Sequence, residues 1–360
     1  MGRNEMEMSV ALPTGANSWK VAVRAEQLGY ACAWFLDTPL LNAELFASMA
    51  VAAAKTSRIK LFSGVMIPSN RLAPVAASGL ATLNALAPGR IGFGVSTGFT
   101  GRRTMGLKPV TLARMSKYIE VVQGLLGGEM VEWDEEGGTH KIRFLNPDLG
   151  LINIDDPIPL AISALGPKGR ALVVKYGAQW ITGSSYPQRE RADIEDMRRL
   201  WLENRRDPDD FYPICVVAGR VLDDGEAVDS EKTRAQAGPS AAMLFHANVE
   251  EAEFGLLVHG TFPFPAQLEE YRKVYQKYEP ADARYLSNHR GHMMFVRPEE
   301  THLTGDIIKA FTVTGTKKEV VERLKGIKAL GFKQVQINTV PGHEEEMMER
   351  WADVMADVNA

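Results

Sequence analysis

Short apolar runs alternate with longer segments of helical spacing along almost the whole chain. Eight apolar runs predict buried strands at 9–13, 31–36, 59–67, 91–95, 158–162, 178–182, 212–221 and 333–338. Apolar residues three and four positions apart predict helices at 19–28, 43–55, 73–86, 112–126, 168–175, 194–204 and 316–330, and a last one at 344–358. Eight strands with intervening helices predict an α/β fold of the (β/α)8 TIM-barrel type.

Two stretches break this alternation. Residues 129–144 predict a β-hairpin with Gly137 and Gly138 at its turn. Residues 224–306 are too long for one crossover, so we expect a helical insertion between the seventh and eighth strands, placed to cover an active site. The 360 residues would fill two average domains or one barrel, and the repeated alternation favours a single barrel domain over 1–360.

Composition narrows the class of protein. A net charge of −4 without a dense basic tract argues against nucleic acid as a main partner. The sequence has no apolar run long enough for a membrane span and no signal-peptide pattern at its start, so we expect a cytoplasmic protein. Cys32 and Cys215 lie within apolar runs, as free thiols in a reducing compartment would.

The fourth predicted strand runs into a glycine-rich loop, RIGFGVSTGFTG at 90–101. Ligands of α/β proteins bind at the carboxyl ends of strands, which makes this loop a candidate cofactor site. Gly92, Gly94 and Gly98 are spaced one residue too widely for a dinucleotide fingerprint, and that motif belongs after a first strand. The alternative is a glycine-rich strand packed tightly in a barrel wall.

A second candidate lies in the predicted insertion, where His289 and His292 are three residues apart. No cysteine or third ligand with metal-site spacing accompanies them, so we predict no metal. Histidine titrates near physiological pH, which suits substrate binding or proton transfer, and we assign both a catalytic role. Structural hydrogen bonding within the insertion is the alternative.

Five segments in the right order resemble the luciferase-like monooxygenase superfamily, which includes bacterial luciferase, FMN-dependent monooxygenases and coenzyme F420-dependent reductases. They are AEQLGYACAWFLD (25–37), SGVMIP (63–68), residues 76–101, PLAISALGP (159–167) and FTVTGTKKEV (311–320). The resemblance covers most of the chain and implies a barrel with a flavin-like ring at its carboxyl-terminal mouth. It also implies a non-prolyl cis peptide at Gly64 and Val65, behind the ring.

The resemblance assigns further cofactor contacts. Thr97 and Gly98 would approach the ring, and Ser163 would precede a phosphate-binding turn. Backbone N–H groups at a helix start bind phosphate, and basic side chains add charge. The residues of this turn are Gly166, Pro167, Lys168, Gly169 and Arg170.

Asp37 ends the second predicted strand, where its carboxylate would orient cofactor or substrate as a catalytic residue. Capping of the following turn is the alternative. The chain departs from its resemblance nearby, since many F420-using relatives carry histidine where Thr38 stands. Some F420 reductases also carry an acidic residue where Phe99 stands, so Phe99 is expected to pack.

The resemblance leaves three functions open. We expect an FMN-dependent monooxygenase acting on a small organic substrate, with a separate flavin reductase as a candidate supplier of reduced cofactor. The first alternative is an F420-dependent hydride-transfer reductase or dehydrogenase, because residues 105–129 resemble the methylenetetrahydromethanopterin reductase branch. The second is a flavin-binding protein without catalysis. A homodimer or higher homo-oligomer is expected in each case.

Overall fold

Eight parallel strands close into a barrel in the computed structural model, which describes residues 5–183, 187–255 and 262–360. The strands are β1 (Glu7–Leu12), β2 (Cys32–Phe35), β3 (Lys60–Ser63), β4 (Ile91–Val95), β7 (Leu160–Ser163), β8 (Gln179–Gly183), β9 (Pro213–Val217) and β10 (Gln334–Asn338). The barrel closes because β1 pairs with both β2 and β10, in registers such as Ser9 with Cys32 and Glu7 with Gln334. The predicted barrel is confirmed.

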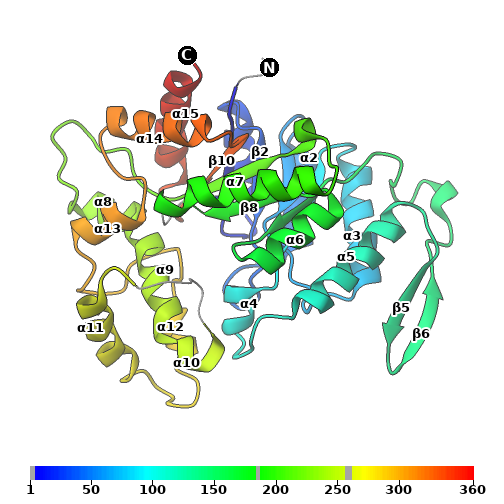
Figure 1. The fold of residues 1–360 in the computed structure, drawn as a ribbon, viewed down its shortest axis with the longest axis horizontal. Helices are drawn as coiled ribbons and strands as arrows, with labels where there is room; N and C mark the ends of the chain where they lie inside the picture. Colours follow the sequence, from blue (N-terminus) through cyan, green and yellow to red (C-terminus); the bar gives the residue numbers. More distant parts are fainter. Residues whose placement is uncertain (1–4, 184–186, 256–261) are drawn as a thin grey trace.

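Helices cover the outside of the barrel (Figure 1). They are α1 (Ser18–Gln27), α2 (Leu45–Lys55), α3 (Ala73–Leu86), α5 (Leu112–Leu126), α6 (Pro167–Tyr176), α7 (Pro187–Glu203), α14 (Lys317–Ala329) and α15 (Glu344–Asn359). The short helix α4 (Phe99–Arg103) follows β4 at the carboxyl-terminal end of the barrel. Two 3₁₀ turns, Pro147–Leu149 and Pro208–Asp210, lie in connecting loops. The capping box of Thr316 and Glu319 opens α14. None of the helices in the described ranges is both long and apolar enough to cross a membrane.

The predicted hairpin is present as β5 (Val131–Glu135) and β6 (Gly138–Ile142), which project from the barrel (Figure 1). Its turn lies one residue earlier than predicted. Glu136 and Gly137 both have positive φ, of 52° and 78°, whereas Gly138 already pairs with Glu135. Consecutive positive φ values give the turn the twist that antiparallel strands require.

A helical insertion separates β9 from β10, the seventh and eighth barrel strands. Its helices are α8 (Glu231–Gln236), α9 (Gly238–Val249), α10 (Glu251–Phe254), α11 (Pro265–Tyr275), α12 (Tyr285–Asn288) and α13 (Gly305–Phe311). Residues 256–261 of this insertion lie outside the described residues. Phe245 of α9 is at the centre of a separate apolar core with Tyr271 and Phe311. Figure 1 places α9 to α12 on the side of the barrel away from both chain termini.

Candidate active site

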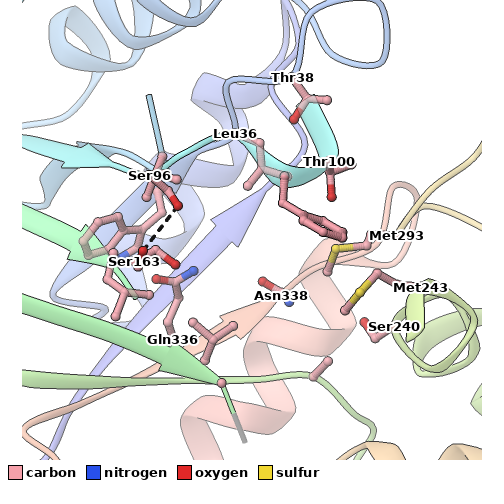
Figure 2. Close-up of a pocket in the computed structure, with 18 of the residues that line it drawn as sticks. Leu36, Thr38, Ser96, Thr100, Ser163, Ser240, Met243, Met293, Gln336 and Asn338 are labelled. Atoms are coloured by element: carbon pink, nitrogen blue, oxygen red, sulfur yellow. Dashed lines mark hydrogen bonds between the residues drawn. The ribbon is translucent and has the colours of Figure 1, made fainter. Parts of the chain in front are cut away.

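A cavity of about 400 Å³ opens between the carboxyl ends of the strands and the insertion. Figure 2 shows side chains of the barrel, among them Ser96, Gln336 and Asn338, on one side of it. Met243 and Met293 of the insertion approach from the other side. The insertion therefore forms one wall of the cavity, as a cover of the active site would.

Sequence-predicted residues divide into two groups around this cavity. Those that line it are Asp37, Gly64, Val65, Gly98, Ser163 and His292. Those outside its lining are Thr97, Gly166, Pro167, Lys168, Gly169, Arg170 and His289. The predicted residues at the ends of the second to fifth barrel strands therefore lie at one cavity, together with one histidine of the insertion.

The glycine-rich loop after β4 serves both packing and the cavity. Gly98 has a positive φ of 81°, and a side chain there would meet Ile67 at 2.4 Å. Its turn leads into α4, a short helix that the sequence pattern did not predict. Phe99 and Thr100 at the start of α4 line the cavity. The loop therefore packs tightly at Gly98 and also borders the cavity, and its role as a cofactor site stays a prediction.

The peptide bond between Gly64 and Val65 is cis, as the family resemblance implied. Both residues line the cavity next to Ser63, whose hydroxyl donates to the Gly94 carbonyl and accepts from its N–H, each at 2.9 Å. The two strands are so close that a Cβ on Gly94 would lie 2.1 Å from the Ser63 carbonyl oxygen. A glycine is therefore required at position 94, because β3, which leads into the cis peptide bond, approaches β4 closely there.

Replacing Gly94 with alanine is expected to lower the free energy of unfolding by about 1–3 kcal/mol, because the added methyl group overpacks β3 against β4. Urea denaturation measures the change. The matched control is Gly326→Ala on the exposed face of α14, where no atom lies within 4 Å of the new methyl group. That control is expected to gain about 0.5–1 kcal/mol from helix propensity. A Gly94→Ala protein as stable as the wild type would contradict the packing argument.

Asp37 lies at the cavity wall, but an arginine holds its carboxylate. Arg71 Nη1 is 2.9 Å from both carboxylate oxygens, and Asn70 donates to one of them at 3.1 Å. The backbone N–H of Ile67 donates to the same oxygen at 3.2 Å. This arrangement favours a role in fixing the loop after β3, rather than the catalytic role expected from the sequence.

The turn before α6 supplies backbone groups for an anion but not the expected arginine. Gly166 precedes the helix without a side-chain cap, and Lys168 in the first turn is exposed. Arg170 is buried and points to α7, where it pairs with Asp193 at 2.7 Å and Asp196 at 3.0 Å. The predicted phosphate contact of the Arg170 side chain is therefore incompatible with the observed geometry, because two carboxylates already occupy its guanidinium.

Two polar atoms in the barrel interior lack a partner. Trp34 of β2 and Gln336 of β10 are 1% and 6% exposed, and both line the cavity. The indole Nε1 of Trp34 and the amide oxygen of Gln336 make no hydrogen bond within the described structure. Buried polar groups are normally satisfied, so these atoms are suited to a ligand with polar edges. The cavity thus fits a ligand with polar groups, such as a flavin-type ring system, better than a purely apolar compound.

Sequence reasoning missed these two residues and most of the insertion wall. Gln336 and Asn338 stand on one face of the last strand, so alternation along that strand was the signal that could have found them. Ser240, Met243 and Met293 carry no motif, and only the fold brings them to the cavity.

His289 and His292 lie beside a third histidine, His246 of α9, which the sequence did not single out. The three rings are buried, and the Nδ1 atom of His292 lies 3.3 Å from that of His289 and 3.5 Å from that of His246. Two buried glutamates, Glu250 and Glu300, contact the outer histidines. Within the described residues, no group of histidine, cysteine or acidic side chains has the geometry of a metal site.

The sequence profile of the luciferase-like monooxygenase family matches residues 2–334. The chain belongs to this family. A 5,10-methylenetetrahydromethanopterin reductase of Archaeoglobus fulgidus is 23% identical over 328 residues, 89% of each chain. A limonene 1,2-monooxygenase of Rhodococcus erythropolis is 31% identical over 160 residues, 42% of this chain and 40% of the relative.

Solved structures agree on the fold of this family member. An F420-dependent secondary alcohol dehydrogenase, solved with an F420–acetone adduct, superimposes with a TM-score of 0.70 at 17% identity. The match covers 99% of this chain and all of that one. The chain is an oxidoreductase of the luciferase-like family, whose named relatives include F420-dependent enzymes and monooxygenases.

Proposed function

We propose that the chain catalyses hydride transfer between a deazaflavin cofactor of the F420 type and a small organic substrate. The observation that carries the proposal is the cavity, which is lined by Trp34 and Gln336, each with an unpartnered polar atom, and by His292, whose imidazole can exchange a proton. The full-length similarity to a methylenetetrahydromethanopterin reductase supports the same choice. This reverses the preference for FMN that the sequence suggested.

Different residues at and beside the cavity would bind different parts of the cofactor. Gly64 and Val65 would support the ring from behind, Gly98 would border it, and the N-terminus of α6 with Lys168 would bind a phosphate. When bound, a deazaflavin supplies a carbon atom that gives or accepts a hydride. The chain's own groups then orient the substrate, exclude water and move the accompanying proton.

An FMN-dependent monooxygenase is the second candidate. The similarity to a limonene monooxygenase and the sulfur- and aromatic-rich wall of Met243, Met293 and Phe99 favour an apolar substrate. In that case a separate flavin reductase would supply reduced FMN. For both candidates we propose a homodimer or higher homo-oligomer, which sedimentation measurements can check.

Titration of the purified protein with F420 and FMN, each oxidised and reduced, tests the proposal. We expect a saturable change in F420 absorbance and fluorescence, and weaker binding of FMN. Lys168→Glu is expected to weaken F420 binding about tenfold by charge reversal at the phosphate turn. The matched control is Lys325→Glu on the exposed face of α14. Tight FMN binding without F420 binding would overturn the proposal in favour of the second candidate.

A further inference from the structure

The three buried histidines have a fixed order of contacts. His292 lies in the middle, at the cavity, and its Nε2 atom is 3.4 Å from the hydroxyl oxygen of Thr100. His246 and His289 lie behind it and contact its Nδ1 atom. Thr100 also lines the cavity, so the Nε2 edge of the His292 ring lies toward the cavity and the Nδ1 edge lies toward the other two histidines.

The glutamates determine which nitrogens carry protons. Glu250 Oε2 lies 3.0 Å from Nε2 of His289, and Glu300 Oε1 contacts Nε2 of His246. A carboxylate only accepts, so each outer histidine places its proton on Nε2 and leaves a lone pair on Nδ1. Both lone pairs point at Nδ1 of His292, which must then carry its own proton there.

In this tautomer, the Nε2 atom of His292 carries a lone pair that can accept a proton at the cavity. The Thr100 hydroxyl can donate to it, which satisfies the whole chain of contacts. Arg297 Nη2, at 3.0 Å from His246 Nε2, also lies 2.8 Å from Glu300, and the carboxylate can accept from both groups. This arrangement of protons satisfies the histidine–glutamate, histidine–histidine and histidine–threonine contacts, whereas Arg297 Nη2 and His246 Nε2 are both donors that share the Glu300 carboxylate.

We propose that His292 is the general base and acid of this site and that His246 and His289 relay its proton toward Glu300 and Glu250. The inference rests on the proposed function and adds a substrate class, a small alcohol or its carbonyl product. Oxidation of such a substrate removes one proton from oxygen for each hydride removed from carbon, which matches a base at the cavity.

Other titratable groups of the cavity lining are poorly suited to this role. Asp37 pairs with Arg71, Glu190 pairs with Arg323, and Asp193 pairs with Arg170. An arginine that donates to a carboxylate occupies lone pairs with which that carboxylate would accept a substrate proton. Among the histidines and carboxylates that line the described cavity, His292 is the one that is not held in an ion pair with an arginine.

The proton transfers balance in the direction of alcohol oxidation. The hydroxyl proton moves to His292 Nε2, and the Nδ1 proton of His292 moves to Nδ1 of His246 or His289. A bound deazaflavin would supply the acceptor for the carbinol hydride and its electron pair, and the C–O single bond of the alcohol would become a carbonyl. The cluster ends with one added proton on an outer imidazolium that contacts a carboxylate. Reduction of the carbonyl follows the same path in reverse.

Charges around the cluster allow it to hold this proton only transiently. Arg103 and Arg297 balance Glu250 and Glu300, so the resting cluster of neutral histidines has no net charge. Burial lowers the pKa of His292 well below its ordinary value, and His289, His246, Arg297 and Arg103 act in the same direction. His292 therefore rests as the free base and passes its proton on.

Imidazole ¹⁵N NMR of the cofactor-free protein tests the tautomers without any reaction. Each of the seven histidines is expected to show a long-range ¹H–¹⁵N pattern that identifies its tautomer. We expect His292 to carry its proton on Nδ1, and His246 and His289 on Nε2. A His292 with its proton on Nε2 would overturn the relay, whatever cofactor the enzyme uses. Failure to turn over alcohols by a protein that binds F420 would overturn the substrate class, and failure to bind F420 would overturn the proposed function. Neither result would change the tautomer assignment.

Steady-state kinetics with F420 and a panel of small secondary alcohols test the catalytic role. His292→Gln is expected to lower kcat by about 10²–10⁴-fold. Replacement of the exposed hairpin residue in His140→Gln is expected to change nothing. Glu300→Gln removes an anion beside the relay, so the acid limb of the pH profile is expected to move down by about one to three units. A Glu300→Gln enzyme that loses activity without this move has suffered only structural damage, which would contradict the relay.

Discussion

Replacing Asp37 with alanine is expected to lower the free energy of unfolding by about 3 kcal/mol, because Arg71 loses its buried partner. Asp37 is 4% exposed, and its carboxylate accepts from Arg71, Asn70 and the backbone of Ile67. Without it, the Ile67 N–H loses its side-chain acceptor, Arg71 keeps only the exposed Glu44, and Asn70 keeps only the Asp37 backbone carbonyl at 3.5 Å. Urea denaturation measures the loss.

A double-mutant cycle separates this structural role from catalysis. If Asp37 acts through Arg71, the cost of Asp37→Ala should largely vanish in an Arg71→Met background, leaving a coupling of roughly 1–3 kcal/mol. Glu44→Gln is the matched control, since Glu44 contacts Arg71 from an exposed position and should cost less than about 1 kcal/mol. An Asp37→Ala protein of wild-type stability but without activity would restore the catalytic assignment made from the sequence.

The barrel could be predicted from the sequence because its signal is repeated eight times. Helices with a strong apolar face, such as α3 and α5, have the bounds that the periodicity gave. The helix predicted to begin at Ile194 begins at Pro187, because its first turns are mainly charged and polar and show little apolar periodicity. The short helix α4 was missed, since its five residues lie among glycines.

The site could be predicted only where local sequence determines it. The cis turn at Gly64 and the histidine pair at His289 and His292 lie within short recognisable segments. The partners of these residues come from distant parts of the chain. His246 is 46 residues from His292, and Arg71 is 34 residues from Asp37, so no local pattern links them.

Acid is expected to destabilise the insertion well before it unfolds the barrel. Burial lowers the pKa of His302 from 6.5 to about 4, and the ring packs against Phe245 and Tyr271. Below about pH 6.5, His302 binds a proton in the unfolded chain but not in the folded chain, so the free energy of unfolding falls as the pH falls. A shift of this size removes about 3 kcal/mol by roughly pH 4. The lowered pKa values of His246 and His292 act in the same sense.

Hydrogen exchange can follow this loss, because it reports the amides of α9 in the insertion separately from those of the barrel strands. Tryptophan fluorescence would report mainly on the barrel. Protection of α9 amides is expected to fall between about pH 6.5 and pH 4 while that of β1 and β10 persists. His302→Phe keeps an aromatic ring in the same core but cannot bind a proton. This variant should retain more protection than the wild type at about pH 5, by roughly 2 kcal/mol, and His140→Gln on the hairpin should not. Equal acid sensitivity of the wild type and His302→Phe would show that a group other than His302 controls the stability of the insertion.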